Sequence, residues 1–599
     1  MNKDGDRPTG AEDITWDLAD LYAGLDDPKI EGDLQAAEDA ADALDRTYRG
    51  RIASLTPEEL GELLAGYERI EDLAGRVGAF AYLYWASDTG DPQRGALLQR
   101  ATERGSQLNQ KLVFLELELA HAPDEVAEAW LDHEALRRYS HWLAQLRRYR
   151  PHLLSEPEEK ILSEKAVTGR NAWDRFFDEM HGAARFEFRG EKLTRDQVLS
   201  RLYSPDRDER RDAAAAVTAG LQELRRPNTY VFNTILADKA SDDRLRNYPT
   251  WISARNVANE VDDATVEALI EAVTSRYDIV ERYYRLKKVL LGLDELYDYD
   301  RYAPLPAADR RYSWDEARAI VLNAYARFHP RMAEEASHFF DRRWIDAAIR
   351  PGKLGGAFSH GVVPSVHPYV LMNYEGMTRD VMTLAHELGH GVHQKLAGVQ
   401  GTLQHRTPLT TAETASVFGE MLVFQDLISG ESDPSVRLAM LTSKLEDSFA
   451  TAFRQVAMNR FEHAIHTTRR DEGELTSERF GELWLGTQQA MFRESVTLRD
   501  DYALWWSYIP HFIGVPGYVY AYAFGELLVL ALYARYQEDG AGFAPRYLEM
   551  LSAGGSDWPH EIVRPLGVDL TDLGFWHKGL QILSDMVGDA EYMAAQVAR

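Results

Sequence analysis

Signals for the start of a helix, each followed by a long helical pattern, occur again and again along this chain. The stretch from Ser54 reads SLTPEELGELLAGYERIEDLAGRVGAFAYLYWASD, in which Thr56 can cap a helix, Pro57 suits its first position and Glu59 completes a capping box. Apolar residues then follow at helical spacing. The same start signal is found in SEPEEKILSEK, from Ser155, and in YSWDEARAIVLNAY, from Tyr312. The sequence therefore predicts a mainly α-helical protein.

Two segments favour β-strands instead. ARFEFRGEKLT, residues 184–194, alternates polar and apolar residues around a turn at Gly190, and GGAFSHGVVPSVHPYVLMNYEG, residues 355–376, mixes β-branched and aromatic residues with turn formers. The first segment precedes the charged run SPDRDERRDAAAA. We therefore predict an N-terminal helical domain over residues 1–195 and a second domain over residues 196–599.

Composition and charge exclude several classes of function. The chain has 599 residues and no cysteine, so disulfides and thiolate metal sites are impossible, and histidine and carboxylate must hold any metal. The formal net charge of −29 argues against nucleic-acid and anionic membrane partners. The amino terminus carries acids where a signal peptide needs basic and then apolar residues. These features predict a cytoplasmic protein.

One apolar run, residues 517–533, needs a separate interpretation. It contains Glu526 at its middle and four tyrosines, which are costly in hydrocarbon but ordinary in a protein interior. We therefore predict a buried helix here and no membrane span.

The stretch MTLAHELGHGVHQ, from Met382, concentrates three histidines and an acid in eight residues. His386 and His390 are four positions apart, so on a helix their side chains lie on one face about 6 Å apart and can bind one metal ion. Glu387 follows the first histidine directly, and its carboxylate can therefore accept a proton from a metal-bound water. The spacing suits a zinc ion, and the alternative is an ordinary polar helix face, so the motif alone does not decide between them.

A catalytic zinc ion usually has three protein ligands, so a third is needed. His393 lies about 4.5 Å further along the helix axis than His390, out of reach of a metal held by the first pair, and we assign it to packing or a substrate contact. Leu396 occupies the position of the third metzincin histidine, which excludes that arrangement. A carboxylate from another helix is the remaining solution.

The segment RTPLTTAETASVFGEML supplies two candidate carboxylates. Glu413 and Glu420 are seven positions apart, two turns along one helix face, so one could bind the metal and the other could support a ligand. Thr410 and Glu413 also have the spacing of a capping box, so Glu413 could simply close a helix start. The residues alone leave both interpretations open.

Four motifs in order resemble one known family. They are GKLGGAFSHG, PYVLMNYEG, HELGHGVHQ with AETASVFGE, and WWSYIPHFIGVPGYVYAYAFG, which together span residues 352–525. The chain resembles the thimet-oligopeptidase-like zinc metallopeptidases, most closely the oligoendopeptidase F branch. The resemblance implies a large multi-helical ellipsoid with a small β-sheet beside the active-site helix and a deep substrate channel, and residues 196–599 as the catalytic domain.

The same resemblance implies roles for the histidine cluster and its neighbours. His386, His390 and Glu413 correspond to the ligands of one zinc ion per chain, and Glu387 to the general base. Glu420 corresponds to a second glutamate that orients a ligand histidine.

Further roles follow from the last motif. His511 and Tyr518 correspond to residues that donate hydrogen bonds to the developing oxyanion, with Tyr522 one helical turn further and Tyr520 as another candidate. Gly517 stands where the branch is expected to carry an aromatic residue, as does Ile513. Apart from the resemblance, tyrosines at this spacing are typical of a buried helix.

The resemblance implies a zinc-dependent endopeptidase that hydrolyses internal bonds of short unstructured oligopeptides. The stretch before the histidine helix, which contains Gly355, Gly356, Ala357, Phe358 and His360, could offer a sheet edge to an extended peptide. A related zinc carboxypeptidase that trims the carboxyl end, or an inactive peptide-binding protein with the same fold, are the alternatives. The sequence leaves the oligomeric state open.

Overall fold

The chain divides into two compact units, each assembled from segments that are distant in sequence. The computed structural model describes residues 8–305 and 310–597, so the first seven residues of the amino terminus lie outside the described part. Unit 1 combines Met1–Arg150, Asp309–Gly430 and Arg535–Asp569, and unit 2 combines Pro151–Ala308, Glu431–Ala534 and Leu570–Arg599. Each unit contains residues from both sides of the boundary predicted after residue 195, because the chain enters each unit more than once. The division into 1–195 and 196–599 stays a prediction.

Unit 1 is helical apart from one small sheet. Its α-helices are α1 (Pro28–Tyr48), α2 (Pro57–Ala86), α3 (Pro92–His121), α4 (Asp124–Leu131), α5 (Ser140–Arg148), α14 (Trp314–Phe328), α15 (Pro330–Asp341), α16 (Thr378–Ala397), α17 (Leu409–Ala412), α18 (Ser416–Gly430), α24 (Phe543–Ala553) and α25 (Pro559–Val563).

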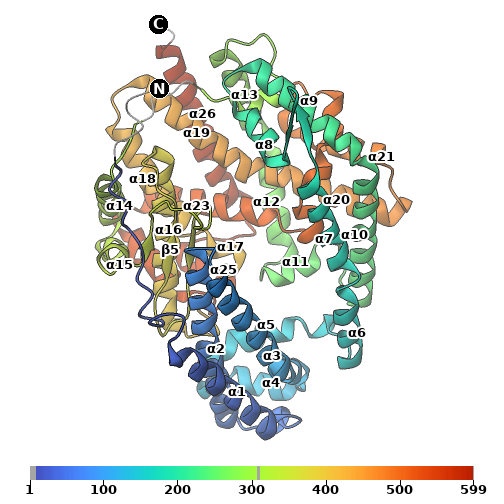
Figure 1. The fold of residues 1–599 in the computed structure, drawn as a ribbon, viewed down its shortest axis with the longest axis vertical. Helices are drawn as coiled ribbons and strands as arrows, with labels where there is room; N and C mark the ends of the chain where they lie inside the picture. Colours follow the sequence, from blue (N-terminus) through green and yellow to red (C-terminus); the bar gives the residue numbers. More distant parts are fainter. Residues whose placement is uncertain (1–7, 306–309, 598–599) are drawn as a thin grey trace. The chain divides into compact units, whose positions relative to one another are not determined.

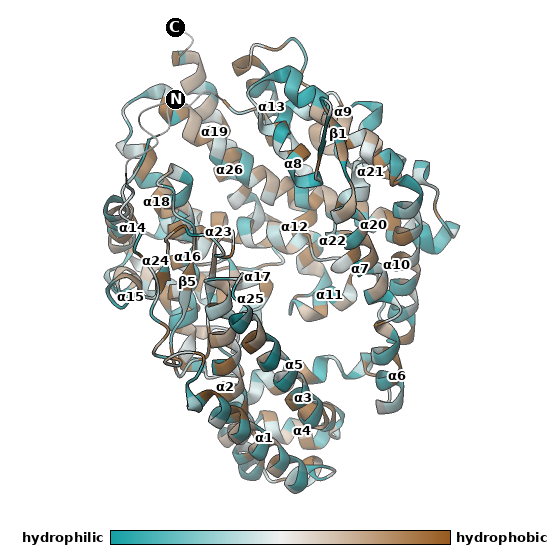
Figure 2. Cartoon of the chain, in the orientation of Figure 1, coloured by the Kyte–Doolittle hydropathy of each residue, from teal (hydrophilic) through white to brown (hydrophobic). Residues whose placement is uncertain are grey.

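The helix predicted from Thr56 is α2. The Thr56 hydroxyl accepts the backbone N–H of Glu59 at 3.2 Å, and the Glu59 carboxylate accepts that of Thr56 at 2.9 Å, which confirms the predicted capping box. Leu60, Leu63 and Leu64 face a core shared with α1 and α3 and are fully buried. Burial of each leucine contributes about 2 kcal/mol. In Figure 2 these helices carry both hydrophobic and hydrophilic residues along their length.

The sheet of unit 1 has three short strands in the order β3–β5–β4. β3 (Ile345–Asp346) pairs parallel with β5 (Tyr369–Leu371), and β4 (Phe358–His360) pairs antiparallel with it, with Ser359 opposite Val370. β4 therefore lies at an edge of this sheet. Both β4 and β5 contact α16, and Figure 1 shows α16 beside β5. The predicted mainly α fold with a small sheet beside the histidine helix is confirmed; β3 was not predicted, because two residues carry no readable alternation.

Unit 2 is also mainly helical. Its α-helices are α6 (Glu156–Ala166), α7 (Arg170–Ala183), α8 (Arg195–Ser200), α9 (Arg207–Glu223), α10 (Arg225–Leu245), α11 (Ser253–Ala258), α12 (Asp263–Ser275), α13 (Tyr277–Leu290), α19 (Pro434–Thr451), α20 (Phe453–Glu472), α21 (Ser477–Phe492), α22 (His511–Gly514), residues 520–534 of α23 (Tyr520–Asp539), and α26 (Leu573–Val597).

Two predictions about unit 2 are confirmed. β1 (Phe186–Phe188) and β2 (Glu191–Leu193) form the predicted hairpin, and Gly190 in its turn has a φ of 87°, which glycine adopts readily. The apolar run that ends at Tyr533 forms α23, whose residues from Ala523 to Tyr533 are buried. Among the described residues, no helix combines the length and the apolar character that crossing a membrane requires.

Candidate functional site

Helix α16 carries His386, Glu387 and His390. Asp380 fixes its start, because the carboxylate accepts the backbone N–H groups of Glu375 and Met377 at 2.9 and 3.0 Å. Apolar side chains at helical spacing bury the other face of the helix; they are Val381, Leu384, Ala385, Leu388, Val392 and Leu396. His386 and His390 lie on the opposite face of the helix, and the centroids of their rings are 4.9 Å apart.

His386, His390 and Glu413 form a compact group of potential metal ligands. One donor atom from each lies within 4.8 Å of the other two. Glu413 Oε2 is 3.4 Å from the Nε2 atom of each histidine. The three side chains are partly buried. Two imidazoles and one carboxylate match the donor set of a catalytic zinc site with an open coordination position.

Glu413 does not lie in a continuous helix with Glu420, as the sequence suggested. It follows the short helix α17, and α18 begins at Ser416, so residues 413–415 form a break between the two helices. The capping-box alternative for Glu413 is wrong, because no helix starts at Thr410. Instead, the Ser416 hydroxyl donates to Glu413 Oε2 at 2.7 Å and fixes the carboxylate.

A glycine between the two histidines lets this break pack directly on α16. A Cβ atom built on Gly389 would lie 2.4 Å from the carbonyl oxygen of Ala415 and 2.6 Å from the Cα of Ser416. No side chain fits in such a space. The backbone next to Glu413 therefore approaches the histidine helix at the position where the carboxylate must meet both rings.

We expect Gly389→Ala to lower the free energy of unfolding by about 1–3 kcal/mol, because the added methyl group would force α16 and residues 413–416 apart. Chemical denaturation of wild type and variant measures the difference. Gly105→Ala is the matched control in the same unit: this glycine lies inside α3, and a Cβ atom added to it would meet no atom within 4 Å. The control should gain up to about 1 kcal/mol. Unchanged stability of Gly389→Ala would contradict the tight packing.

Glu420 lies where it can orient a histidine. Its Oε2 is 3.3 Å from His386 Nδ1, while Nε2 of the same ring faces Glu413. Burial lowers the pKa of His386, but the hydrogen bond to Glu420 and the charge of Glu413 together raise this pKa above its ordinary value. The arrangement is that of a carboxylate holding the ring of a metal ligand.

Glu387 and Glu413 have opposite pKa shifts. Burial raises the pKa of Glu387 against the opposing effect of the two histidines, and the side chain is 7% exposed. Burial also acts on Glu413, but the hydrogen bond and charge of His390 outweigh it and lower the pKa of Glu413 to about 2. Glu413 is thus a permanent anion near neutral pH, while Glu387 has a greater affinity for protons.

His393 is a packing residue, in agreement with one of the two roles expected for it. It is 5% exposed, and burial lowers its pKa to about 3, so the ring is neutral. It does not belong to the metal-ligand group.

β4 is attached to α16 through a residue that the sequence interpretation missed. The Ser359 hydroxyl donates to Gln394 Oε1 at 2.9 Å, and Gln394 Nε2 donates to the carbonyl oxygen of Ser359 at 3.4 Å. Serine and glutamine at these positions gave no signal, because the contact depends on tertiary structure. The edge strand is thereby fixed beside the predicted base.

The predicted substrate-binding residues lie on and before this edge strand. Gly355 and Gly356 are exposed, and Asn373 Nδ2 donates to the carbonyl oxygen of Gly356 at 3.1 Å. Ala357, Phe358 and His360 are partly buried. Burial lowers the pKa of His360 to about 4. Among these residues, those of β4 offer a backbone edge rather than charged side chains.

The residues predicted to donate to the oxyanion form a cluster within unit 2. His511 Nε2 is 3.3 Å from the Tyr522 hydroxyl, and the Tyr518 ring lies 5.0 Å from the Tyr522 ring, centroid to centroid, in an edge-to-face arrangement. All three side chains are partly buried. Burial and the charge of Arg454 lower the pKa of His511, so its imidazole is neutral and carries one N–H donor near pH 7.

Tyr520, the other candidate, lies outside this cluster. Its side chain is fully buried, its hydroxyl donates to Asn256 Oδ1 at 2.8 Å, and it accepts Asn259 Nδ2 at 2.9 Å. Its hydroxyl is thus occupied in the core.

The backbone conformation explains why position 517 is glycine and not the aromatic residue that was expected. The φ of Gly517 is 76°, in the left-handed region that a bulky side chain adopts only with strain. The turn that precedes Tyr518 therefore requires glycine.

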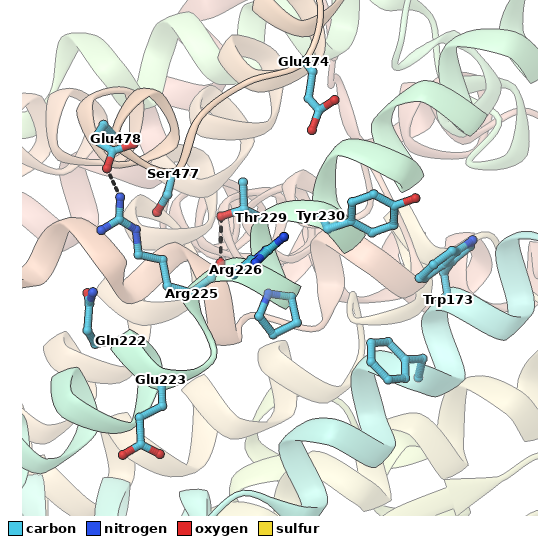
Figure 3. A pocket seen from close by; sticks show the side chains of 12 residues that line it. Trp173, Gln222, Glu223, Arg225, Arg226, Thr229, Tyr230, Glu474, Ser477 and Glu478 are labelled. Carbon is cyan, nitrogen blue, oxygen red and sulfur yellow. Dashed lines mark hydrogen bonds and ion pairs between the residues drawn. The ribbon is translucent and has the colours of Figure 1, made fainter.

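A separate hollow in unit 2, with a volume of about 920 Å³, contains none of the predicted site residues. Figure 3 shows Trp173 and Tyr230 on one side of it and Arg225 paired with Glu478 on the other. None of the described residues that line it belongs to the group of potential metal ligands. We assign it no part in catalysis.

A mainly helical fold, in which an HExxH helix meets a carboxylate as the third potential metal ligand, is typical of a metallopeptidase. Comparison with known families agrees. The family described as peptidase family M3 matches residues 200–582, more than half of the chain, and the one described as oligopeptidase F matches residues 118–186. The chain belongs to peptidase family M3. The resemblance to the oligoendopeptidase F branch is thus confirmed.

Similar proteins cover nearly the whole chain. Oligopeptidase PepF of Bacillus subtilis is 29% identical over 94% of this chain and 84% of its own length, and group B oligopeptidase PepB of Streptococcus agalactiae is 27% identical over 98% of both. Among solved structures, oligoendopeptidase-F from Enterococcus faecium has a TM-score of 0.69 and 22% identity, over 95% of this chain and 98% of that one. A peptidase from Chlamydophila abortus reaches a TM-score of 0.87 at 22% identity, over 98% of this chain and 100% of that one.

Proposed function

We propose that this chain is a zinc-dependent oligoendopeptidase, in which His386, His390 and Glu413 hold one zinc ion and Glu387 is the general base. The observation that carries the proposal is the approach of Glu413 Oε2 to within 3.4 Å of both histidine Nε2 atoms, on the helix that also carries Glu387. Zinc fits because two imidazoles and one carboxylate are a donor set that it takes in catalytic sites. When bound, the ion supplies Lewis-acid polarisation of the scissile carbonyl and of the attacking water.

The chain's own residues carry the proton transfers. Glu387 takes a proton from the attacking water while the oxygen of that water forms a bond to the peptide carbon. The same carboxyl group then delivers this proton to the amide nitrogen as the C–N bond breaks. Burial is the largest cause of the raised pKa of Glu387. A raised pKa suits a group that must accept a proton and then release it.

The negative charge that develops on the carbonyl oxygen needs hydrogen-bond donors. We propose His511 and Tyr518 for this role, with Tyr522 supporting the His511 ring through their 3.3 Å contact. One such donor contributes about 3–4 kcal/mol to the transition state. Glu420 supports the metal site by holding His386.

We propose that the substrate is an extended peptide that pairs with the edge of β4. Main-chain hydrogen bonds to an edge strand depend little on side chains, so the specificity is broad. Residues Gly355 to His360 supply this edge and its approach. We also propose the cytoplasm as the location, which a sequence without cysteine fits.

Incubation with unstructured peptides of about ten residues tests the function. We expect products cut at internal bonds, measured by mass spectrometry over time, because edge-strand pairing holds a peptide on both sides of the cut. A compact folded protein without flexible ends, incubated in parallel, should remain intact. Stepwise loss of single residues from the carboxyl end would indicate a carboxypeptidase instead, and rapid digestion of the folded protein would contradict the restriction to oligopeptides.

A further inference from the structure

Helix α20 carries a buried carboxyl group that the proposed peptide chemistry does not use. Glu462 is fully buried. Its Oε1 accepts the backbone N–H of Gly517 at 2.8 Å, and its Oε2 has no hydrogen-bond partner among the described residues. Burial raises the pKa of Glu462 to about 8, against the opposing effect of the Gly517 hydrogen bond. Burying a half-satisfied carboxyl group costs stability, so its presence needs an explanation.

The group that Glu462 binds is the turn with the left-handed glycine. A Cβ atom on Gly517 would lie 3.4 Å from Arg255 Cβ and 3.5 Å from atoms of Ile252 and Trp251. The start of α11 therefore packs against one side of the turn while Glu462 binds its N–H group. They add to the turn's own hydrogen bond, in which the backbone N–H of Tyr518 donates to the carbonyl oxygen of Val515 at 3.1 Å.

Tyr518 is the next residue, and its surroundings depend on this turn. The Arg255 guanidinium lies 5.9 Å from the centre of the Tyr518 ring, and the Tyr522 ring lies 5.0 Å from it. Two residues further, the hydroxyl of Tyr520 is fixed in the core by Asn256. The backbone is thus anchored on both sides of Tyr518, at Gly517 by Glu462 and at Tyr520 by α11.

We propose that Glu462 is a positioning residue that fixes the Gly517 turn and thereby the position of the Tyr518 hydroxyl. This inference rests on the proposed function, in which Tyr518 stabilises the developing oxyanion. A donor misplaced by about 1 Å costs on the order of a hundredfold in rate. A carboxyl group in α20 would thus set the efficiency of a tyrosine 56 positions later in the chain.

Two variants test the role of the Glu462 oxygen. Glu462→Leu removes the acceptor, and we expect kcat to fall about 10- to 100-fold with little change in KM, because Tyr518 acts mainly in the transition state. Glu462→Gln keeps an acceptor oxygen in the same place and should retain kcat within about twofold. Rescue by glutamine but not by leucine is the expected pattern for the neutral, buried acceptor.

Asn233→Leu is the matched control. Asn233 is 4% exposed in the same unit, and its Oδ1 accepts the backbone N–H of Leu475 at 2.8 Å, as Glu462 does for Gly517. This control should lose stability as Glu462→Leu does, with an unchanged kcat for the folded enzyme. An equal loss of kcat in the control would mean that Glu462→Leu acts through general destabilisation, and would overturn the proposal.

A double-mutant cycle with Tyr518→Phe separates this inference from the proposed function. If Glu462 acts through Tyr518, Glu462→Leu should lower kcat by less than about twofold in the Tyr518→Phe background. Effects that multiply would overturn the positioning role while leaving the role of Tyr518 intact. Full activity of Tyr518→Phe alone would refute the proposed role of Tyr518, and the inference with it.

Discussion

Glu387→Gln is expected to lower kcat by about three to four orders of magnitude while the protein still binds its metal and peptide. Glutamine preserves the shape of the side chain but cannot accept a proton from the attacking water or deliver one to the leaving nitrogen. Because Glu387 is not among the three grouped donors, the metal content should not change. A fluorescence-quenched peptide measures kcat, elemental analysis the bound metal, and peptide binding can be titrated with the inactive variant.

The control for this variant is another carboxylate-to-amide change in unit 1. Asp341→Asn removes a charge from an exposed ion pair with Arg318, 2.7 Å long, and should leave kcat unchanged. Hydrolysis by the metal-loaded Glu387→Gln protein at more than about a tenth of the wild-type rate would remove Glu387 from the role of base.

Removal of the metal has an equally large expected effect. Dialysis against a chelator should abolish hydrolysis, and one equivalent of zinc per chain should restore it. The reason is that the side chains of the His–His–Glu group cannot polarise the scissile carbonyl without a bound metal ion. His390→Ala removes one of the three donors, so we expect it to bind zinc far more weakly and to stay inactive at equimolar zinc. Calorimetric titration of the metal-free proteins with zinc measures both.

His393→Ala is the comparison for the ligand variant. His393 lies three residues further along α16 and outside the donor group, so its replacement should leave one zinc site of nearly unchanged affinity, at some cost in stability. A loss of zinc binding equal to that of His390→Ala would contradict the assignment of the ligands. Full activity of the chelator-treated protein would contradict a metal mechanism altogether.

The periodicity and capping signals predicted the helices well, because both are local. The capping box at Thr56, the hairpin at Gly190 and the buried helix α23 all depend on residues close in sequence. The pairing of His386 with His390 is of the same kind. The two compact units could not be predicted, because their boundaries depend on contacts between segments hundreds of residues apart.

Other features of the site depended on tertiary packing. The sequence suggested one helix through Glu413 and Glu420, but residues 413–415 form a break, and the backbone at residues 415 and 416 lies against Gly389. The resemblance pointed to Glu413 despite this error, since its motif does not depend on helical continuity. The contacts of Ser359 and Ser416 had no sequence signal, because a serine hydroxyl donates to whichever acceptor the tertiary structure brings near it.

The donors of the metal group all belong to unit 1, whereas Tyr518 and its supports belong to unit 2. Metal loading and turnover therefore report on different parts of the polypeptide. If Tyr518 has the proposed role, a preparation with a full complement of metal would still be inactive when the segment around residue 517 is damaged, so the active fraction has to be measured by turnover and not by metal analysis.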